Sequence, residues 1–137
     1  MKAYFDSSAF AKRFIEESGS DDVESICAQA SELGLSVICV PEIVSALNRR
    51  RRERALTQDQ YKVAKRRLLD DVRDADIISL TPTVIGSAIM MLEASPVRAM
   101  DALHVACALE WGAELFASSD KHQIQAAKLA GIKTKLI

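Results

Sequence analysis

The sequence has few aromatic residues and no strong excess of charge of either sign. Phe, Trp and Tyr make up 5% of the 137 residues, and 18 Lys and Arg nearly balance 19 Asp and Glu, for a formal charge of -1. This balance excludes a highly basic protein that coats nucleic acid by bulk charge, although it allows a local basic face. With so few aromatic side chains, no platform for stacking bases can be identified.

Cysteine is also scarce. There are three, Cys27, Cys39 and Cys107, and no two of them form a CxxC pair. Cys39 lies in an apolar run and Cys107 in an apolar helical stretch, a pattern typical of small buried thiols. We therefore expect reduced cysteines in a reducing cytoplasm, and not a secreted domain held together by disulfides.

No hydrophobic run is long enough to cross a bilayer. The longest stretch without a charge, residues 77–92, has sixteen residues and is interrupted by Thr-Pro-Thr. Near the amino terminus, Asp6 precedes any apolar core of a secretion signal. Because 49% of the residues are hydrophobic, the chain is too apolar for disorder. These features predict a soluble, cytoplasmic protein with no membrane association.

Short apolar runs typical of buried strands alternate with longer helical stretches along the whole chain. The expected strands are 2–5, 35–40, 77–80, 114–117 and 132–137, and the expected helices are 9–17, 22–33, 42–55, 58–72, 84–94, 99–111 and 121–130. This alternation predicts one three-layer α/β domain over residues 1–137, with a central parallel five-stranded sheet and helices on both faces.

Two consecutive helices, 42–55 and 58–72, separate the second expected strand from the third. They predict an antiparallel helical hairpin inserted into an otherwise simple sheet. Thr57, followed by Gln60 three positions later, is typical of a capping box at the start of the second helix.

Three acidic residues, Asp6, Glu42 and Asp120, each follow an expected strand. In open α/β sheets, ligands bind beyond the carboxyl ends of the strands, so these side chains are candidates for a shared site. Considered singly, however, an acid in such a position is more often a helix cap or a first-turn residue.

A fourth acid, Asp101, lies in a helix that is apolar nearly all round, where an unpaired carboxylate is costly. Arg98 is the only local candidate for an ion pair. If Asp101 points to the same sheet edge as the other three acids, a divalent cation that prefers oxygen ligands is the simplest way to stabilise them. Such a set suits Mg²⁺ or Mn²⁺, and not Zn²⁺, and would support hydrolysis of a phosphodiester by an activated water.

Four short motifs carry these acids, in order Asp6-Ser7-Ser8, PEIVSAL at 41–47, MDALHVA at 100–106 and Ser118-Ser119-Asp120. In order and spacing they resemble the motifs of PIN-domain ribonucleases, and in particular the VapC toxin branch. The resemblance extends over essentially the whole chain.

The resemblance implies a PIN fold with a four-acid Mg²⁺ or Mn²⁺ site for RNA cleavage. Its catalytic and metal-binding residues would be Asp6, Glu42, Asp101 and Asp120. The supporting hydroxyls would be those of Ser8 and Ser118; Ser118 stands where the family usually has Thr and keeps the hydroxyl.

The resemblance also implies the function and the partners. The chain would be the endoribonuclease toxin of a VapBC-type toxin–antitoxin pair, with RNA as its substrate. A cognate antitoxin would lie across the helical hairpin and the active-site groove, and the toxin would form a homodimer.

Two other functions compete with this one. A haloacid-dehalogenase-like phosphatase needs a second Asp two positions after the first, where this chain has Ser8. A catalytically silent PIN-like module that binds nucleic acid or protein would be expected to lack at least one of the four acids. All four are present, and the silent module remains the alternative.

Residues 49–73 contain ten basic and four acidic residues. They are either a solvated helix surface or a guide for an RNA backbone leading away from Glu42, with Arg49, Arg50 and Arg52 as possible contacts. Of the two histidines, His104 is interpreted as a buried residue that orders local hydrogen bonds, although a ligand or base role stays open. His122 is expected to be exposed.

Overall fold

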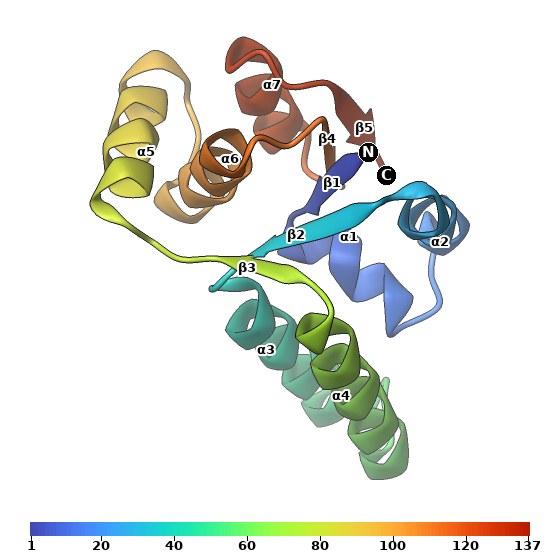
Figure 1. The fold of residues 1–137 in the computed structure, drawn as a ribbon. Helices are drawn as coiled ribbons and strands as arrows, with labels where there is room; N and C mark the ends of the chain where they lie inside the picture. The colour runs from blue at the N-terminus through green and yellow to red at the C-terminus, as the bar shows by residue number, and fades with distance from the viewer.

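The computed structural model describes all residues from 1 to 137, and its five strands form one parallel sheet in the order β3-β2-β1-β4-β5 (Figure 1). The strands are β1 (Lys2–Phe5), β2 (Glu32–Ser36), β3 (Asp76–Ile78), β4 (Leu115–Ser118) and β5 (Thr134–Leu136). The helices are α1 (Ser7–Phe10), the 3-10 helix η1 (Ala11–Arg13), α2 (Ser20–Gln29), α3 (Cys39–Arg52), α4 (Gln58–Arg73), α5 (Pro82–Ala94), α6 (Ala99–Trp111) and α7 (Lys121–Leu129).

The alternating side chains of the central strand β1 divide the core in two. Ala3 and Phe5 pack with α1 to α4 on one face of the sheet, whereas Tyr4 packs with Phe116 and α5 to α7 on the other. Because both faces are covered, the strands are apolar on both sides, which explains their continuous hydrophobic runs. The predicted three-layer α/β architecture is confirmed.

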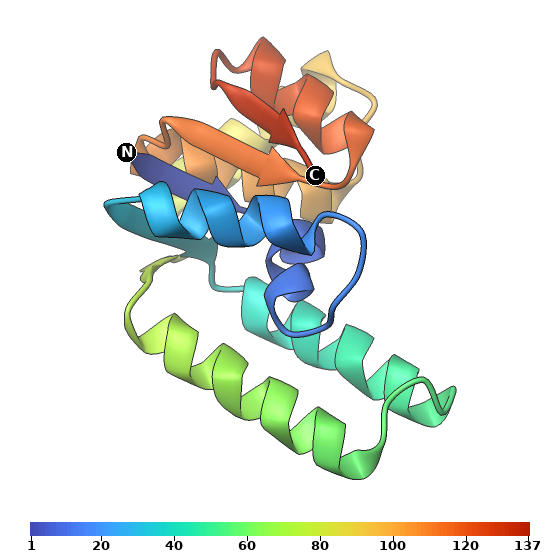
Figure 2. The ribbon, with the colours of Figure 1, turned by 90° about the vertical axis from the view of Figure 1, so that its right-hand side faces the viewer.

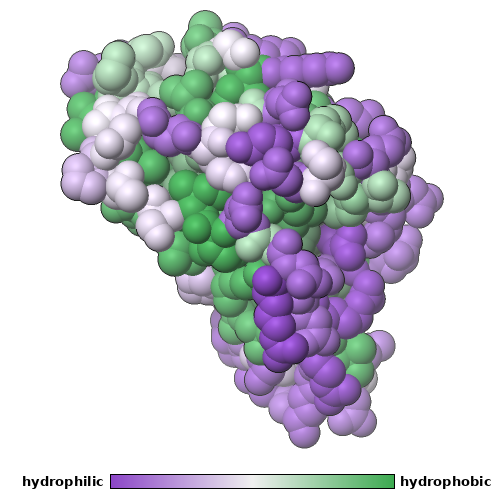
Figure 3. All heavy atoms as spheres, in the orientation of Figure 1, coloured by the Kyte–Doolittle hydropathy of each residue, from purple (hydrophilic) through white to green (hydrophobic).

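The helical hairpin of α3 and α4 joins β2 to β3 and extends away from the sheet (Figure 2). The capping box predicted at Thr57 and Gln60 is present at the start of α4. Between the helices, the hydroxyl of Tyr61 accepts a hydrogen bond from Asn48 at 3.0 Å. The hairpin insertion is thus confirmed. Figure 3 shows hydrophilic residues over much of the hairpin end of one face, and hydrophobic residues gathered closer to the sheet.

The boundary between the second strand and the following helix was predicted wrongly. β2 begins at Glu32, which pairs with Lys2 of β1, and it ends at Ser36. The apolar residues that follow form a turn and the first turn of α3, which begins at Cys39. An apolar run does not distinguish a buried strand from the buried start of a helix. Pro41 fits there because the first helical turn needs no backbone N–H donor.

The first two helices are also shorter than expected. The carboxylate of Asp6 accepts a hydrogen bond from the backbone N–H of Ala9, so α1 begins at Ser7 and lasts one turn before η1. α2 ends at Gln29, because Glu32 and Leu33, which were predicted at the end of this helix, belong to β2. The remaining elements lie within a few residues of the predictions.

Other sequence-based expectations have direct outcomes in the structure. All three cysteines are free thiols; Cys39 and Cys107 are buried as expected, and Cys27 is partly exposed. The His122 side chain is exposed, also as expected. None of the helices is sufficiently long and apolar to cross a membrane.

Candidate active site

Three of the four predicted acids, Glu42, Asp101 and Asp120, line one cavity of about 620 Å³. Glu42 lies in the first turn of α3 and Asp101 in the first turn of α6, while Asp120 is the residue before α7. α3 and α7 follow β2 and β4, whose carboxyl ends lie at one edge of the parallel sheet, whereas α6 follows α5 and places its first turn at the same cavity. The structure therefore brings together three acids that lie far apart in the sequence.

Asp6, the fourth acid, is not among the residues that line this cavity, and it is only 1% exposed. Both of its carboxylate oxygens accept hydrogen bonds: Oδ1 from Ser8 and from the backbone N–H of Ala9, and Oδ2 from Ser8 and Ser118, all at 2.7–2.9 Å. Burial raises the pKa of Asp6, although His104 and these hydrogen bonds act in the opposite direction.

The two predicted supporting hydroxyls connect Asp6 to the last acid. Ser118 donates to Asp6 and accepts a hydrogen bond from the backbone N–H of Asp120 at 2.9 Å. Ser8 accepts one from the backbone N–H of Ser119 at 3.2 Å. Asp6 and Asp120 are thus joined through a single buried hydroxyl.

The carboxylate of Glu42 is held at one oxygen. Oε1 accepts hydrogen bonds from Ser7 Oγ at 2.7 Å and from His104 Nε2 at 2.6 Å. Burial alone would raise the pKa of Glu42, but the hydrogen bonds from His104 and Ser7 outweigh it and keep that pKa below its ordinary value. Glu42 is therefore ionised at neutral pH.

His104 is 1% exposed, and its second ring nitrogen, Nδ1, lies 2.9 Å from the hydroxyl of Tyr4. The interpretation of His104 as a buried histidine that orders local hydrogen bonds is confirmed. Sequence reasoning did not identify Ser7 or Tyr4 as its neighbours. Their position beside Asp6 at the end of β1 was the only signal available.

Asp101 is partly exposed, in contrast to the buried carboxylate expected from its apolar helix. The expectation failed because Asp101 lies in the first turn of α6, where the helix opens onto the cavity. Its partner is not Arg98 but Gln123 of α7, whose Nε2 donates to Oδ1 at 2.8 Å. Gln123 is 5% exposed, and its own Oε1 has no hydrogen-bond partner. Nothing in the sequence pointed to this residue.

The donor set at the cavity fits a divalent cation that prefers oxygen. Asp120, like Glu42 and Asp101, has one oxygen held by the protein, here by the backbone N–H of His122 at 2.7 Å. The second oxygen of each of these three carboxylates accepts no hydrogen bond from the protein. The three carboxylates share the cavity with one guanidinium, that of Arg98, so negative charge is in excess.

The carboxylates do not form a compact cluster. No three Asp, Glu, His or Cys side chains converge closely enough to make a ready metal-binding group. Oxygen donors of this kind are nevertheless the ones that Mg²⁺ and Mn²⁺ take in proteins. The residues therefore fit such an ion in the chemistry of their donors, and three of them line the same cavity.

The basic segment borders the same region. Arg49 and Arg50 line an adjoining cavity of about 260 Å³ together with Ser7, Ser8 and Glu42. Within it, Arg50 forms an ion pair with Glu17 at 2.9 Å. Arg52, at the last position of α3, is exposed and does not line this cavity.

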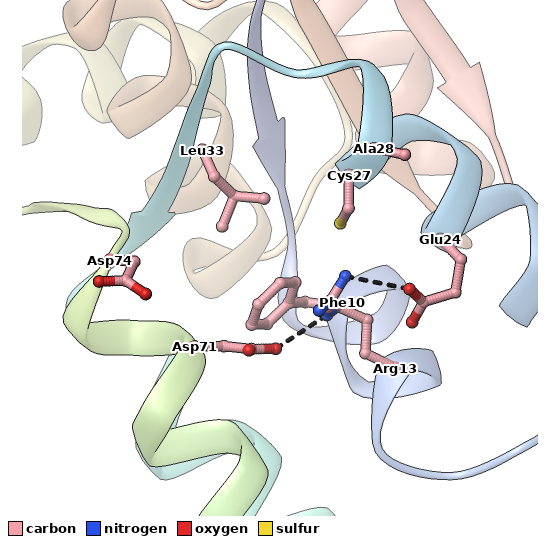
Figure 4. A pocket seen from close by; sticks show the side chains of 8 residues that line it. All are labelled: Phe10, Arg13, Glu24, Cys27, Ala28, Leu33, Asp71 and Asp74. Atoms are coloured by element: carbon pink, nitrogen blue, oxygen red, sulfur yellow. Dashed lines mark hydrogen bonds and ion pairs between the residues drawn. The ribbon is translucent and has the colours of Figure 1, made fainter.

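A separate pocket of about 360 Å³ lies between α2 and α4 and contains none of the predicted site residues (Figure 4). In it, Arg13 forms ion pairs with Asp71 at 2.8 Å and with Glu24 at 3.3 Å. Cys27 faces the same pocket, and burial raises the pKa of its thiol. With its guanidinium engaged by two carboxylates, Arg13 ties the first segment of the chain to α2 and α4.

Comparison with known families gives an independent identification. Residues 3–129 match the model of the PIN domain. The chain belongs to the PIN domain family. The family resemblance drawn from the four acidic motifs is thereby confirmed.

Individual relatives of this PIN domain agree with that assignment. Ribonuclease VapC45 and ribonuclease VapC49, from two strains of Mycobacterium tuberculosis, are each 32% identical over 109 residues, which is 80% of this chain and 76% of each relative. Among solved structures, a toxin–antitoxin complex from Klebsiella pneumoniae contains a chain with the same fold. Its TM-score is 0.73 at 14% identity, covering 98% of this chain and 99% of that one.

Proposed function

We propose that this PIN domain is an endoribonuclease that hydrolyses phosphodiester bonds in RNA and acts as the toxin of a VapBC-type toxin–antitoxin pair. The observation that carries the proposal is the cavity lined by Glu42, Asp101 and Asp120, each with one carboxylate oxygen free of protein donors. The relatives named as VapC ribonucleases, which align with 80% of the chain, support the same activity.

The proposed metal ligands are Asp6, Glu42, Asp101 and Asp120, for Mg²⁺ or Mn²⁺. When bound, such an ion supplies an activated water and neutralises charge on the phosphodiester. The protein itself orients two of these ligands: Ser7 and His104 hold one oxygen of Glu42, and Gln123 holds one oxygen of Asp101, which leaves the second oxygen of each free of protein donors. Because both oxygens of Asp6 have protein donors, Asp6 would bind the ion only by exchanging one of those hydrogen bonds.

RNA is proposed to approach along α3. This helix runs from the cavity at Glu42 to a basic last turn, and Arg49 and Arg50 line the adjoining groove. Phosphates along this path would be attracted to Arg49, Arg50 and Arg52. Each Arg→Ala substitution should reduce the slope of the logarithm of RNA affinity against the logarithm of salt concentration by about 1, the value of one phosphate contact. An arginine whose substitution leaves this slope unchanged does not contact the RNA backbone.

The partners are part of the same proposal. The solved toxin–antitoxin complex with this fold supports a cognate antitoxin, which we place across the helical hairpin and the groove beside Glu42. A homodimer and a cytoplasmic location are also proposed. Size determination of the purified chain, alone and with its antitoxin, would test both assemblies.

The main experiment compares cleavage of a mixed RNA panel by the wild-type chain and by Asp101→Asn, with Mg²⁺, with Mn²⁺ and with EDTA. Asp74→Asn is the matched control, since Asp74 is an exposed acid in the pocket of Figure 4, away from the cavity. We expect metal-dependent cleavage that falls at least about 100-fold in Asp101→Asn and is unchanged in Asp74→Asn.

Equal cleavage by wild type and Asp101→Asn would contradict the assigned site and point to a contaminating nuclease. A calorimetric titration with Mn²⁺ then separates the remaining possibilities. If the wild type binds Mn²⁺ but cuts nothing in the panel, the substrate is more selective than the panel. If it binds no Mn²⁺, the alternative of a catalytically silent binding module is favoured.

A further inference from the structure

A buried chain of polar groups ends on a carboxylate of the cavity. It runs from the hydroxyl of Tyr4 to Nδ1 of His104 at 2.9 Å, and from Nε2 of His104 to Oε1 of Glu42 at 2.6 Å. The hydroxyl of Ser7 meets both ends of the second contact, donating to Glu42 Oε1 and lying 3.2 Å from His104 Nε2.

The imidazole ring of His104 is fixed from both sides. Its side chain is 2% exposed, and the Tyr4 ring, which stacks on Phe116 at 5.4 Å, meets it edge-on. Because an ionised carboxylate can only accept a hydrogen bond, Nε2 must carry the proton. The ring therefore presents a donor to Glu42 in one defined orientation.

Packing alone does not account for these groups. An apolar side chain at position 104 would fill the core of α6 without the cost of burying polar atoms. Instead, the contacts of Ser7 and His104 converge on Oε1 of Glu42, which lines the cavity, and leave Oε2 free of protein donors. The buried polar groups thus determine which oxygen of Glu42 is engaged by the protein and which stays free to bind a ligand.

We propose that His104 is a positioning residue for Glu42, that Tyr4 fixes its ring, and that Ser7 shares the task of holding Oε1. Together they direct Oε2 of Glu42 toward a bound cation. This inference rests on the proposed metal site, and it assigns to His104 neither a bond to the metal nor a catalytic proton transfer. Groups that orient a metal ligand in this way often change metal affinity by 10- to 100-fold when they are removed.

The test is Mn²⁺ binding by the full chain, measured by calorimetry in the absence of RNA. We expect the dissociation constant to rise at least about tenfold in His104→Leu, with smaller increases in Tyr4→Phe and Ser7→Ala. Ser7→Thr, which keeps a hydroxyl donor, should bind nearly as the wild type does. Tyr61→Phe is the matched control, because it removes the same hydroxyl from a tyrosine in the hairpin.

A second readout separates positioning from a purely structural role. In cleavage assays, the Mn²⁺ concentration for half-maximal rate should rise by the same factor as the dissociation constant, while the KM of His104→Leu and Tyr4→Phe for RNA at saturating Mn²⁺ equals that of the wild type. A urea unfolding transition for each variant shows that the compared proteins are folded. If His104→Leu fails to fold, the nearly isosteric variants Tyr4→Phe and Ser7→Ala still decide the question.

The two proposals fail in different ways. If the wild type binds Mn²⁺ and the folded variants bind it equally well, His104 does not position Glu42, and the metal site stands. If the wild type itself binds no Mn²⁺, the proposed metal site fails, and the positioning role fails with it.

Discussion

Asp6 and Asp101 carry the same functional group near the same edge of the sheet, but the protein holds them in opposite ways. Asp6 is buried, and both of its oxygens accept hydrogen bonds. Asp101 is partly exposed, accepts one hydrogen bond from Gln123, and lines the cavity. A carboxylate with all its donors in place stabilises the fold, whereas one with a free oxygen retains the capacity to bind a ligand.

The largest expected effect on stability comes from replacing Asp6, the buried member of this pair. Asp6→Ala removes the acceptor for Ser8, Ser118 and the backbone N–H of Ala9, and should lower the free energy of unfolding by about 3 kcal/mol. Asp101→Ala should lower the free energy of unfolding by less than about 1 kcal/mol, because water in the cavity can replace the Asp101 carboxylate as the acceptor for Gln123. Urea unfolding in EDTA measures both values, and equal losses would contradict the contrast.

A smaller loss of stability is expected when the hydroxyls that donate hydrogen bonds to Asp6 are removed. Ser118 is fully buried, so Ser118→Ala leaves the backbone N–H of Asp120 without an acceptor and removes one of the two donors to Oδ2 of Asp6. The loss should be about 1–2 kcal/mol. Ser8→Ala, at an exposed position, should cost less than about 1 kcal/mol. Equal losses in the free energy of unfolding for the two substitutions, measured with urea, would show that burial does not determine how much each serine contributes to stability.

The pH dependence of stability should have opposite signs for Asp6 and Glu42 in the metal-free protein. The pKa of Asp6 is higher in the folded protein than in the unfolded chain. The ionisation of Asp6 therefore lowers the stability of the fold as the pH rises from the ordinary pKa of an aspartate through the pKa of Asp6 in the folded protein. The pKa of Glu42 is lower in the folded protein than in the unfolded chain. Ionised Glu42 therefore stabilises the fold at pH values above the ordinary pKa of a glutamate, and this stabilisation is lost as the pH falls through the pKa of Glu42 in the folded protein.

Unfolding measured from pH 3 to 7 in wild type, Asp6→Asn and Glu42→Gln checks these signs. The stability gap between wild type and Asp6→Asn should narrow as pH rises, whereas the gap for Glu42→Gln should widen. Gaps that move in the same direction would show that the two carboxylates are not held differently.

The smallest expected effect on stability is at Gln123. Its Oε1 already lacks a hydrogen-bond partner in the folded protein, so Gln123→Met exchanges one hydrogen bond for the removal of one unpaired buried atom. The free energy of unfolding should change by less than about 1 kcal/mol. Mn²⁺ binding should nevertheless weaken, since Asp101 loses its only protein donor; unchanged binding in calorimetry would show that Gln123 does not orient Asp101.

Much of the fold could be predicted from the sequence because strands buried on both faces are apolar throughout. The boundary at Cys39 could not, since the apolar run after β2 is equally suited to the buried start of α3. That residues 1–137 form one domain stays a prediction.

For the candidate site, the positions of the acids at strand and helix ends were sufficient to predict a common edge. What the spacing could not show is that Asp6 has both oxygens occupied while the other three acids keep one free. Gln123 comes from a different helix than its partner Asp101, and such contacts depend on tertiary packing that a local pattern does not encode.

The strand order also determines when this site can exist during synthesis of the chain. β1 is made first but lies at the centre of the sheet, between β2 and β4, and β4 begins only at Leu115. Pairing of segments so distant in sequence is slow and requires both to be available. A growing chain therefore carries Asp6 without Ser118 to bind it and without Asp120 until β4 and the residues that follow it have been made, so the proposed four-acid site cannot assemble before that point.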